Sequence, residues 1–277
     1  MAGGRPQRPE ILNASDVQIE GRHPVLEALR AGRPLRKLVV TRGAASSHVL
    51  HHLVGEARRR GVPVQEVDPA VLDRLAQTRT PQGVIAYAAA YTTVDLDDVL
   101  ARGRTRGESP LLLLLDGIED PGNLGAILRS ADAAGVHGVV IPRHRTARLT
   151  PAVAASSAGA IEHVPVAQVT NLARAIERLK AEGVWVIGAD PGAREALYEA
   201  RLLPPVAVVV GGEGRGLSRL VRERCDALVR IPMYGATASL NASVAAGVLL
   251  FEVRRQMGAA RLDASAPRQY NERDLTR

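Results

Sequence analysis

The sequence is poor in residues that form covalent cross-links or long hydrophobic spans. Its 277 residues contain one cysteine, Cys225, which excludes an intrachain disulfide and a cysteine-rich zinc site. The purest apolar run, Leu111 to Leu115, has five residues, whereas a membrane-spanning helix needs roughly 18. The N-terminal sequence MAGGRPQRPE lacks the apolar core of a secretory signal. These absences predict a cytoplasmic protein with no membrane segment.

Aromatic residues are also scarce, at 3% of the chain, which excludes extensive stacking of bases on aromatic side chains. Basic residues are abundant: 36 lysines and arginines against 29 acidic residues give a net charge of +7. Only Lys37 and Lys180 are lysines, and the arginine fork suits phosphate. The charge favours a nucleic-acid partner, although richness in arginine, alanine and glycine is also typical of a GC-rich genome.

The composition predicts a folded chain with two domains. Hydrophobic residues make up 46% and charged residues 23%, as in ordinary globular proteins, and the length suits one large domain or two modest ones. We place the boundary in the polar stretch 92–109, interpreted as a helical turn and a linker. Residues 1–15 are expected to form a disordered tail and residues 258–277 a loose polar one.

Both predicted domains show an α/β pattern. Residues 16–91 predict helices at 25–29, 48–60 and 69–76 and strands at 38–40, 62–67 and 84–88. Residues 110–257 predict strands at 111–115, 139–141, 164–166, 184–187, 206–210 and 228–231, and helices at 124–134, 151–158, 172–181, 217–224 and 240–254. Near-continuous apolar strands that alternate with helices predict a doubly wound α/β domain, whose parallel sheet is covered by helices.

The last predicted helix is apolar on more than one side. Leu240, Val244, Val248 and Phe251 form one stripe, and small residues and Leu249 fill the other faces. A helix of this kind is buried on more than one side. We interpret it as covered by the sheet and by a second subunit, which predicts a homodimer; the alternative is burial within its own domain.

Three segments at the carboxyl ends of predicted strands carry polar residues, and open α/β sheets bind ligands at that edge. The first, DGIEDPGNLGAILR at 116–129, has a Pro-Gly turn followed by a helix that Asn123 is placed to cap. Arg129 lies at the edge of the apolar stripe of that helix. Taken alone, this segment is more readily explained by an ordinary cap and a solvated arginine.

The second segment, GGEGRGLS at 211–218, has four glycines in six residues, which let a ligand approach the backbone closely. It is not a P-loop, because Leu217 stands where lysine is required, and it is not a G-x-G-x-x-G dinucleotide fingerprint. A tight turn alone would explain the glycines. It would not explain Glu213, because a turn needs no carboxylate there.

The third segment, IPMYGATASLNASV at 231–244, joins a predicted strand to the last helix through a loop of small residues. Ser239 is a natural helix cap. Asn241 is a polar group that enters an apolar helix and needs hydrogen-bond partners there. The small residues of the loop leave room for a ligand and bring few charges to repel one.

Together, in this order and spacing, the three segments resemble the SpoU (TrmH-like) family of RNA ribose 2′-O-methyltransferases over residues 110–256. The stretch from GRHPV at 21–25 to TPQG at 80–83 resembles, more weakly, the small RNA-binding domain of the RlmB-like branch. The resemblance implies a C-terminal methyltransferase domain with a trefoil knot. It also implies S-adenosylmethionine as the cofactor, a homodimer and no metal.

The resemblance also implies roles for residues of this chain. Five match the family's catalytic motifs: Asn123, Arg129, Glu213, Ser239 and Asn241. The cofactor would be held largely by backbone, with contacts at Gly211, Gly212, Gly214, Ile231, Met233 and Leu240. Arg129 is awkward as a general base because guanidinium keeps its proton. Either the site depresses its pKa strongly, or Arg129 stabilises the developing alkoxide while an RNA phosphate assists proton removal. We favour the second role.

The small N-terminal domain is expected to select the RNA. A basic run around its first helix and strand is interpreted as binding phosphate, with a solvated face as the alternative; it comprises Arg22, Arg30, Arg33, Arg36 and Lys37. The leading hypothesis is a guanosine of 23S rRNA as the target. A tRNA ribose methyltransferase and an antibiotic-resistance rRNA methyltransferase are alternatives in the same class. A non-catalytic RNA-binding protein is disfavoured by the intact motifs, and a dinucleotide-dependent enzyme by the late glycine loop.

Overall fold

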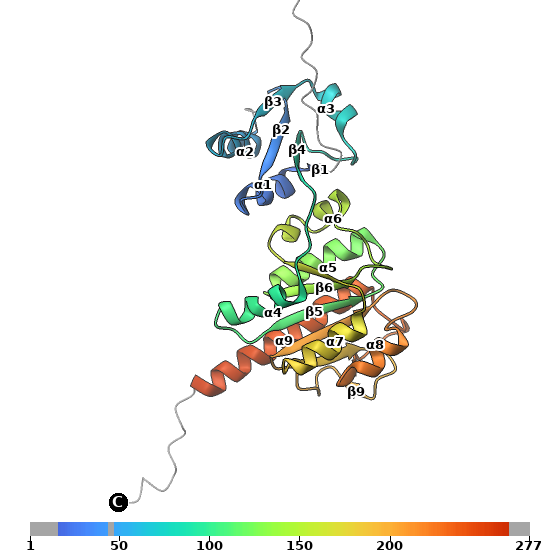
Figure 1. Ribbon diagram of the computed structural model, residues 1–277. Coiled ribbons are helices and arrows are strands. Elements are labelled where there is room, and N and C mark those ends of the chain that lie inside the picture. Colours follow the sequence, from blue (N-terminus) through green and yellow to red (C-terminus); the bar gives the residue numbers. More distant parts are fainter. Residues whose placement is uncertain (1–15, 44–46, 266–277) are drawn as a thin grey trace, which may run out of the picture. The chain divides into compact units, whose positions relative to one another are not determined.

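The computed structural model describes residues 16–43 and 47–265, and the chain divides into two compact units (Figure 1). The first unit contains the N-terminal part up to Val94, with residues 119–132 and 146–165. The second contains 95–118, 133–145 and the chain from 166 onward. The predicted tail at 1–15 lies outside the described residues, as do residues 266–277.

The N-terminal part of the first unit is built on a four-stranded sheet. Its strands are β1 (Asp16–Glu20), β2 (Leu35–Thr41), β3 (Val64–Val67) and β4 (Val84–Ala89), in the order β1-β4-β2-β3. Strand β4 is antiparallel to β1 and β2, and β3 is parallel to β2. The sequence predicts three of these strands but not β1, whose five residues are too short for a clear alternating pattern.

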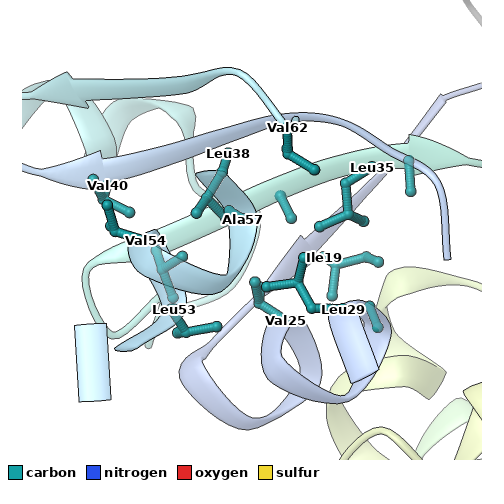
Figure 2. Close-up of a cluster of buried hydrophobic side chains, with 14 of the residues drawn as sticks. Ile19, Val25, Leu29, Leu35, Leu38, Val40, Leu53, Val54, Ala57 and Val62 are labelled. Atoms are coloured by element: carbon teal, nitrogen blue, oxygen red, sulfur yellow. The ribbon is translucent and has the colours of Figure 1, made fainter. Parts of the chain in front are cut away.

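Helices pack on both faces of this sheet because successive strand residues point to opposite sides. Leu38 and Val40 of β2 pack with helices α1 (Arg22–Arg30) and α2 (His48–Arg59), as Figure 2 shows. Val39, between them, packs instead with Leu72 of α3 (Pro69–Leu75). All three helices are where the sequence predicts them, within a few residues at each end.

The first unit also contains α6 (Pro151–Ser156), the 3-10 helix η2 (Ala160–Glu162) and most of α5 (Pro121–Ala133). Pro121 occupies the first position of α5, which suits a residue without an N–H. The Asp120 carboxylate accepts the Asn123 N–H at 2.7 Å and caps the helix. The prediction that Asn123 is the cap is therefore wrong, because Asn123 already lies inside the first turn.

The second unit is built on a seven-stranded sheet in which every pairing is parallel. In sheet order its strands are β7 (Val166–Val169), β6 (Gly138–Pro142), β5 (Leu111–Asp116), β10 (Val206–Gly211), β8 (Trp185–Ala189), β11 (Ala227–Arg230) and β9 (Glu195–Ala196). The predicted parallel sheet is confirmed: five of the six apolar runs coincide with strands, the run at 164–166 shares only Val166 with β7, and β9 is an additional two-residue edge strand. The first five residues of β5 and of β10 are buried, as expected for strands covered on both faces.

Four helices lie wholly within the described residues of the second unit. Helix α4 (Leu96–Thr105) packs on β6 and β7, α7 (Leu172–Ala181) on β8, α8 (Arg219–Arg224) on α7, and α9 (Ala242–Ser265) on β10. The interpretation of 92–109 as a turn and linker is wrong over α4. Acidic residues in the first turn suit a helix N-terminus, and the Asp98 carboxylate accepts the Asp95 N–H at 3.1 Å.

Helix α9 differs from its prediction at both ends. It begins at Ala242 rather than at 240, and it continues to Ser265. Residues 258–265 of the predicted loose tail are therefore helical. No helix in the described part of the chain combines the length and the hydropathy needed to cross a membrane.

Candidate active site

A cavity of about 660 Å³ lies at the carboxyl ends of β10, β8 and β11, which are neighbours in the sheet of the second unit. Its walls come from those strand ends and from the chain between β11 and α9. The lining includes Ala189, Asp190, Val210, Gly211, Gly212, Glu213, Gly214, Arg230, Ile231, Met233, Ser239 and Leu240. The volume suits a small-molecule cofactor, and the position is where open α/β sheets bind ligands. All six residues predicted to contact the cofactor line this one cavity.

The glycine loop after β10 is shaped by close packing of backbone. A Cβ at Gly211 would lie 2.2 Å from the carbonyl carbon of Gly216, and a Cβ at Gly212 would lie 2.1 Å from the carbonyl oxygen of Gly117. These two glycines are thus required by the protein's own backbone, which agrees with the alternative of a tight turn. Gly214 has a φ of +79°, the left-handed region that favours glycine.

Asp116, the last residue of β5, holds this loop in place. Its carboxylate accepts the Ser218 N–H at 2.7 Å, and its carbonyl oxygen accepts the Gly212 N–H at 2.8 Å. The two ends of the loop are therefore fixed to one residue of the neighbouring strand. Asp116 has no role among the residues predicted from the sequence, although its place at a strand end was a usable signal.

Asn241 links the glycine loop to helix α9. Its side-chain Nδ2 donates a hydrogen bond to the Glu213 carboxylate, and its Oδ1 accepts the Ser243 N–H at 2.9 Å. Asn241 is consequently the cap of α9, and the prediction of Ser239 as the cap is wrong, because the helix begins two residues later than expected. Ser239 lines the cavity instead. The structure thus brings Glu213, Ser239 and Asn241 together around this loop.

The other two predicted catalytic residues belong to the first unit. Asn123 is half-buried in the first turn of α5, and Arg129 presents an exposed side chain about 1.7 turns later. Because its side chain is exposed, the Arg129 guanidinium is accessible to a substrate.

Two charged residues that sequence analysis does not single out also line the cavity. Asp190 follows β8; its carboxylate accepts the Gly192 N–H at 2.7 Å and pairs with Arg222 at 3.1 Å. Arg230 ends β11 and donates to the Arg194 carbonyl oxygen at 2.9 Å. Both stand at carboxyl ends of strands that the sequence predicts, which is the signal that could have found them.

Of the five basic residues predicted to bind RNA, two are exposed, Arg30 and Arg36, and three are half-buried, Arg22, Arg33 and Lys37. Arg30 is paired with Glu27 at 3.0 Å, and Arg36 with Asp16 at 2.7 Å. The Arg30 pair is partly exposed and therefore weak, so this guanidinium can exchange its carboxylate for a phosphate. The Asp16 carboxylate is only 2% exposed, so the Arg36 pair is more costly to break.

Arg33 departs from the prediction. Its side chain is only 10% exposed, and its guanidinium lies 2.7 Å from the Glu162 carboxylate, which is 8% exposed. The same guanidinium lies 3.6 Å from the centroid of the Tyr91 ring. A sheltered ion pair is costly to break, so the structure corrects the prediction that Arg33 binds phosphate.

Comparisons with known proteins agree with these observations. The SpoU rRNA methylase family matches residues 110–251, and the substrate-binding domain of RNA 2′-O ribose methyltransferases matches residues 18–94. The chain belongs to the SpoU methyltransferase family. A Bacillus subtilis protein named as a TrmH-family tRNA/rRNA methyltransferase is 45% identical over 236 residues, which is 85% of this chain and 94% of that protein.

Solved structures with the same fold include methyltransferases that contain the cofactor. The SpoU methyltransferase AviRb from Streptomyces viridochromogenes, in complex with AdoMet, is 29% identical with a TM-score of 0.74, over 89% of this chain and 92% of that one. An AdoMet-bound rRNA methyltransferase from Sinorhizobium meliloti is 27% identical with a TM-score of 0.71, over 88% of each chain. A TrmH/SpoU tRNA-modifying enzyme from A. aeolicus is 27% identical with a TM-score of 0.51, over 64% of this chain and 91% of that one.

The cofactor of this family is S-adenosylmethionine, and the cavity fits it. The cavity has the size of a cofactor pocket and an apolar wall that includes Val210 and Leu240. Glu213 and Asp190 add polar groups at the same cavity, as expected where a few placed polar groups orient a ligand. The expectations of family, fold class and cofactor are confirmed.

Proposed function

We propose that this protein methylates the ribose 2′-hydroxyl of a guanosine in 23S rRNA, with S-adenosylmethionine as the methyl donor. The observation that carries the proposal is the hydrogen bond from Asn241 to Glu213. It connects Asn241 of the third motif to Glu213 of the second, which lines the cofactor-sized cavity. A family member that had lost its activity would have no need to keep this pair in contact.

The length of the match supports rRNA over tRNA. The proteins described as rRNA methyltransferases match 88% of this chain, whereas the tRNA-modifying enzyme matches 64%. This chain also has a substrate-binding domain at residues 18–94. We infer that this domain selects an rRNA segment, using the exposed Arg30 and Arg36 and the half-buried Arg22 and Lys37.

In this proposal the cofactor is held at the carboxyl edge of the sheet. The contacts are those of Gly211, Gly212, Gly214, Ile231, Met233 and Leu240, largely through backbone groups. When bound, S-adenosylmethionine supplies an electrophilic methyl group on a sulfonium. Because Asp116 holds both ends of the glycine loop, the N–H and C=O groups of the loop are oriented before the cofactor arrives, which lowers the cost of binding.

Arg129, Asn123, Glu213, Ser239 and Asn241 act on the ribose. Arg129 keeps its charge and stabilises the oxygen as negative charge develops on it. Glu213 is held by Asn241 and positions the substrate, and Ser239 and Asn123 offer hydrogen-bonding groups to the ribose. Much of the rate comes from alignment of the hydroxyl with the methyl group, and an RNA phosphate assists removal of the proton.

We further propose that the protein acts as a homodimer in the cytoplasm. Helix α9 buries Leu250 and Val253, yet it leaves Val244 50% and Phe251 52% exposed. Two large apolar side chains on one helix are suited to cover each other across a subunit interface. A second copy of the chain would bury both.

The proposal is tested by transfer of tritium from labelled S-adenosylmethionine to unmodified 23S rRNA, 16S rRNA and bulk tRNA. We expect label in 23S rRNA alone, mapped to a guanosine ribose, and a decrease of about 100-fold or more in Arg129→Ala. Asp132→Ala, an exposed change on the same helix, is the matched control and should retain activity.

The outcomes separate the parts of the proposal. Label in tRNA alone would keep the reaction and overturn the substrate. Binding of S-adenosylhomocysteine without methylation of any RNA, or of ribosomal particles, would leave an RNA-binding protein. Thermal stabilisation by S-adenosylhomocysteine, and not by NAD, checks the cofactor site by itself.

A further inference from the structure

We propose that residues 151–163, here called the bridge segment, fix the substrate-binding domain at residues 18–94, here called the sheet domain, onto helix α5. The Arg33–Glu162 ion pair holds the bridge segment to the sheet domain. Arg33 is in this view a positioning residue for the RNA and not a phosphate ligand. The inference rests on the proposed function of α5. All of its contacts lie within the first unit.

One end of the bridge segment packs directly on helix α1. Gly159 has a φ of +93°, and a Cβ there would lie 2.5 Å from the Cβ of Glu27. Only glycine allows this approach. The Glu27 carboxylate also lies 3.0 Å from Nε2 of His163, so one residue of α1 makes both contacts.

The ion pair of Arg33 lies beside these contacts. Arg33 follows α1, and its Nη1 donates to the Glu162 carboxylate at 2.7 Å. Its Nη2 donates to the carbonyl oxygen of Ala89, at the end of β4, and the Tyr91 ring lies against the guanidinium at 3.6 Å. Because both charged side chains are about nine-tenths covered, salt and water screen the pair far less than a surface pair.

The other end of the bridge segment packs on helix α5. A Cβ at Gly125 would lie 1.9 Å from the Ser156 Oγ and 2.8 Å from the Ser157 backbone nitrogen. The Ser156 hydroxyl also donates to the Pro121 carbonyl oxygen at 3.1 Å. These contacts flank Asn123 in the first turn of α5, and Arg129 stands four residues beyond Gly125 on the same helix.

The contacts therefore form a continuous path from Arg33 to the helix that carries Asn123 and Arg129. RNA bound by the sheet domain is presented to that helix in one geometry. Since a misplacement of 1 Å can cost a factor of about 100 in rate, loss of the path should weaken use of RNA. It should leave the affinity for cofactor unchanged, because the cofactor cavity is formed wholly by residues of the second unit.

A charge exchange separates this role from direct binding of phosphate. We expect Arg33→Glu and Glu162→Arg each to lower kcat/KM for RNA by about 10- to 100-fold, with an unchanged Kd for S-adenosylhomocysteine. The double variant restores the pair in reversed order and should recover to within about tenfold of the parent, because the Tyr91 contact is not restored. A phosphate ligand would not be recovered, since residue 33 would still be a glutamate.

A distance measurement tests the same contacts without RNA or cofactor. Its result therefore does not depend on whether the proposed function is correct. In a Cys225→Ser background, nitroxide labels at His52→Cys and Asp132→Cys, both exposed, report the separation of α2 and α5. We expect a narrow distribution in the parent, a broad one in Glu162→Arg, and a narrow one in the double variant. Glu162→Gln, a milder change, should broaden it less and serves if Glu162→Arg does not fold.

Two results would overturn the proposal. One is a distribution that stays narrow in both Glu162 variants. The other is a double variant with a narrow distribution but no recovery of kcat/KM for RNA. A decrease in kcat/KM that follows the breadth of the distance distribution across the variants supports it.

Discussion

The Asn241 side chain makes two different contacts with its two polar atoms. Its Oδ1 caps helix α9, and its Nδ2 binds the Glu213 carboxylate. The start of the last helix and the position of the motif glutamate are thus fixed by one residue. Because the atoms differ in chemistry, substitutions can separate the two tasks.

Asn241→Asp should separate stability from activity. Aspartate caps helices as well as asparagine does, but it replaces the donor to Glu213 by a second carboxylate. We expect the free energy of unfolding in urea to change by less than about 1 kcal/mol and methyl transfer to fall by about 100-fold or more. Asn241→Ala lacks both contacts. In addition to the decrease in methyl transfer, it should lose about 0.5–2 kcal/mol of the free energy of unfolding. Equal activity of Asn241→Asp and the parent would contradict the role given to the contact.

Gly212→Ala should disturb the cofactor site through the backbone. Its Cβ would lie 2.1 Å from the Gly117 carbonyl oxygen, so the loop or β5 has to move. We expect a loss of about 2 kcal/mol or more in unfolding free energy and weaker binding of S-adenosylhomocysteine by calorimetry. Gly183→Ala is the control: it has a φ of +79° and nothing within 4 Å of its Cβ, it is not among the residues that line the cavity, and its positive φ costs about 1 kcal/mol. The prediction fails if both variants bind equally well.

Cys225 should be unreactive in the folded protein. Burial, and then the Asp226 charge, raise the pKa of its thiol to about 12 from an ordinary value near 9. Since the thiolate is the nucleophile, alkylation by iodoacetamide at pH 8 should be far slower than in urea. The folded state holds the thiol proton more tightly than the unfolded chain does. The contribution of this thiol to the free energy of unfolding is therefore complete below pH 9 and is lost as pH rises toward 12. Cys225→Ala should show a smaller decrease in stability between pH 8 and 10.

Phe251→Asp should convert the proposed dimer into a monomer. An aspartate at this position would be desolvated against apolar side chains in the interface, without a partner. Sedimentation velocity at micromolar concentration should show a single species of half the mass. Trp185→Asp is the matched control, because Trp185 is 49% exposed on β8 and lies on a different element. A dimer that persists in Phe251→Asp would exclude α9 as the interface.

Periodicity predicted the framework of the fold well. Five of the six apolar runs coincide with strands of the parallel sheet, because a strand buried on both faces requires nearly every residue to be apolar. The run at 164–166 shares only Val166 with β7, an edge strand that is partly exposed. Helix α4 was missed because its acidic first turn looked like a linker. The caps of α5 and α9 were misplaced by two or three residues, since several capping side chains occur near each helix start.

The site was predicted through its motifs, and long-range contacts were not. Nothing in the local sequence shows that Gly212 meets Gly117, or that Arg33 meets Glu162, because partners distant in sequence leave no periodic pattern. A buried arginine and a phosphate-binding arginine look identical in a sequence. The trefoil knot and the homodimer stay predictions.

The order of strands in the second sheet has a consequence for synthesis. Strand β5 ends at Asp116, but β10, which lies beside it, begins at Val206, about 90 residues later. At about 5–20 residues per second, a ribosome needs roughly 5–20 s to deliver that neighbour. For this time five consecutive leucines present an unpaired strand edge, which is a template for aggregation. The nascent chain therefore has a defined interval in which a chaperone is of most use.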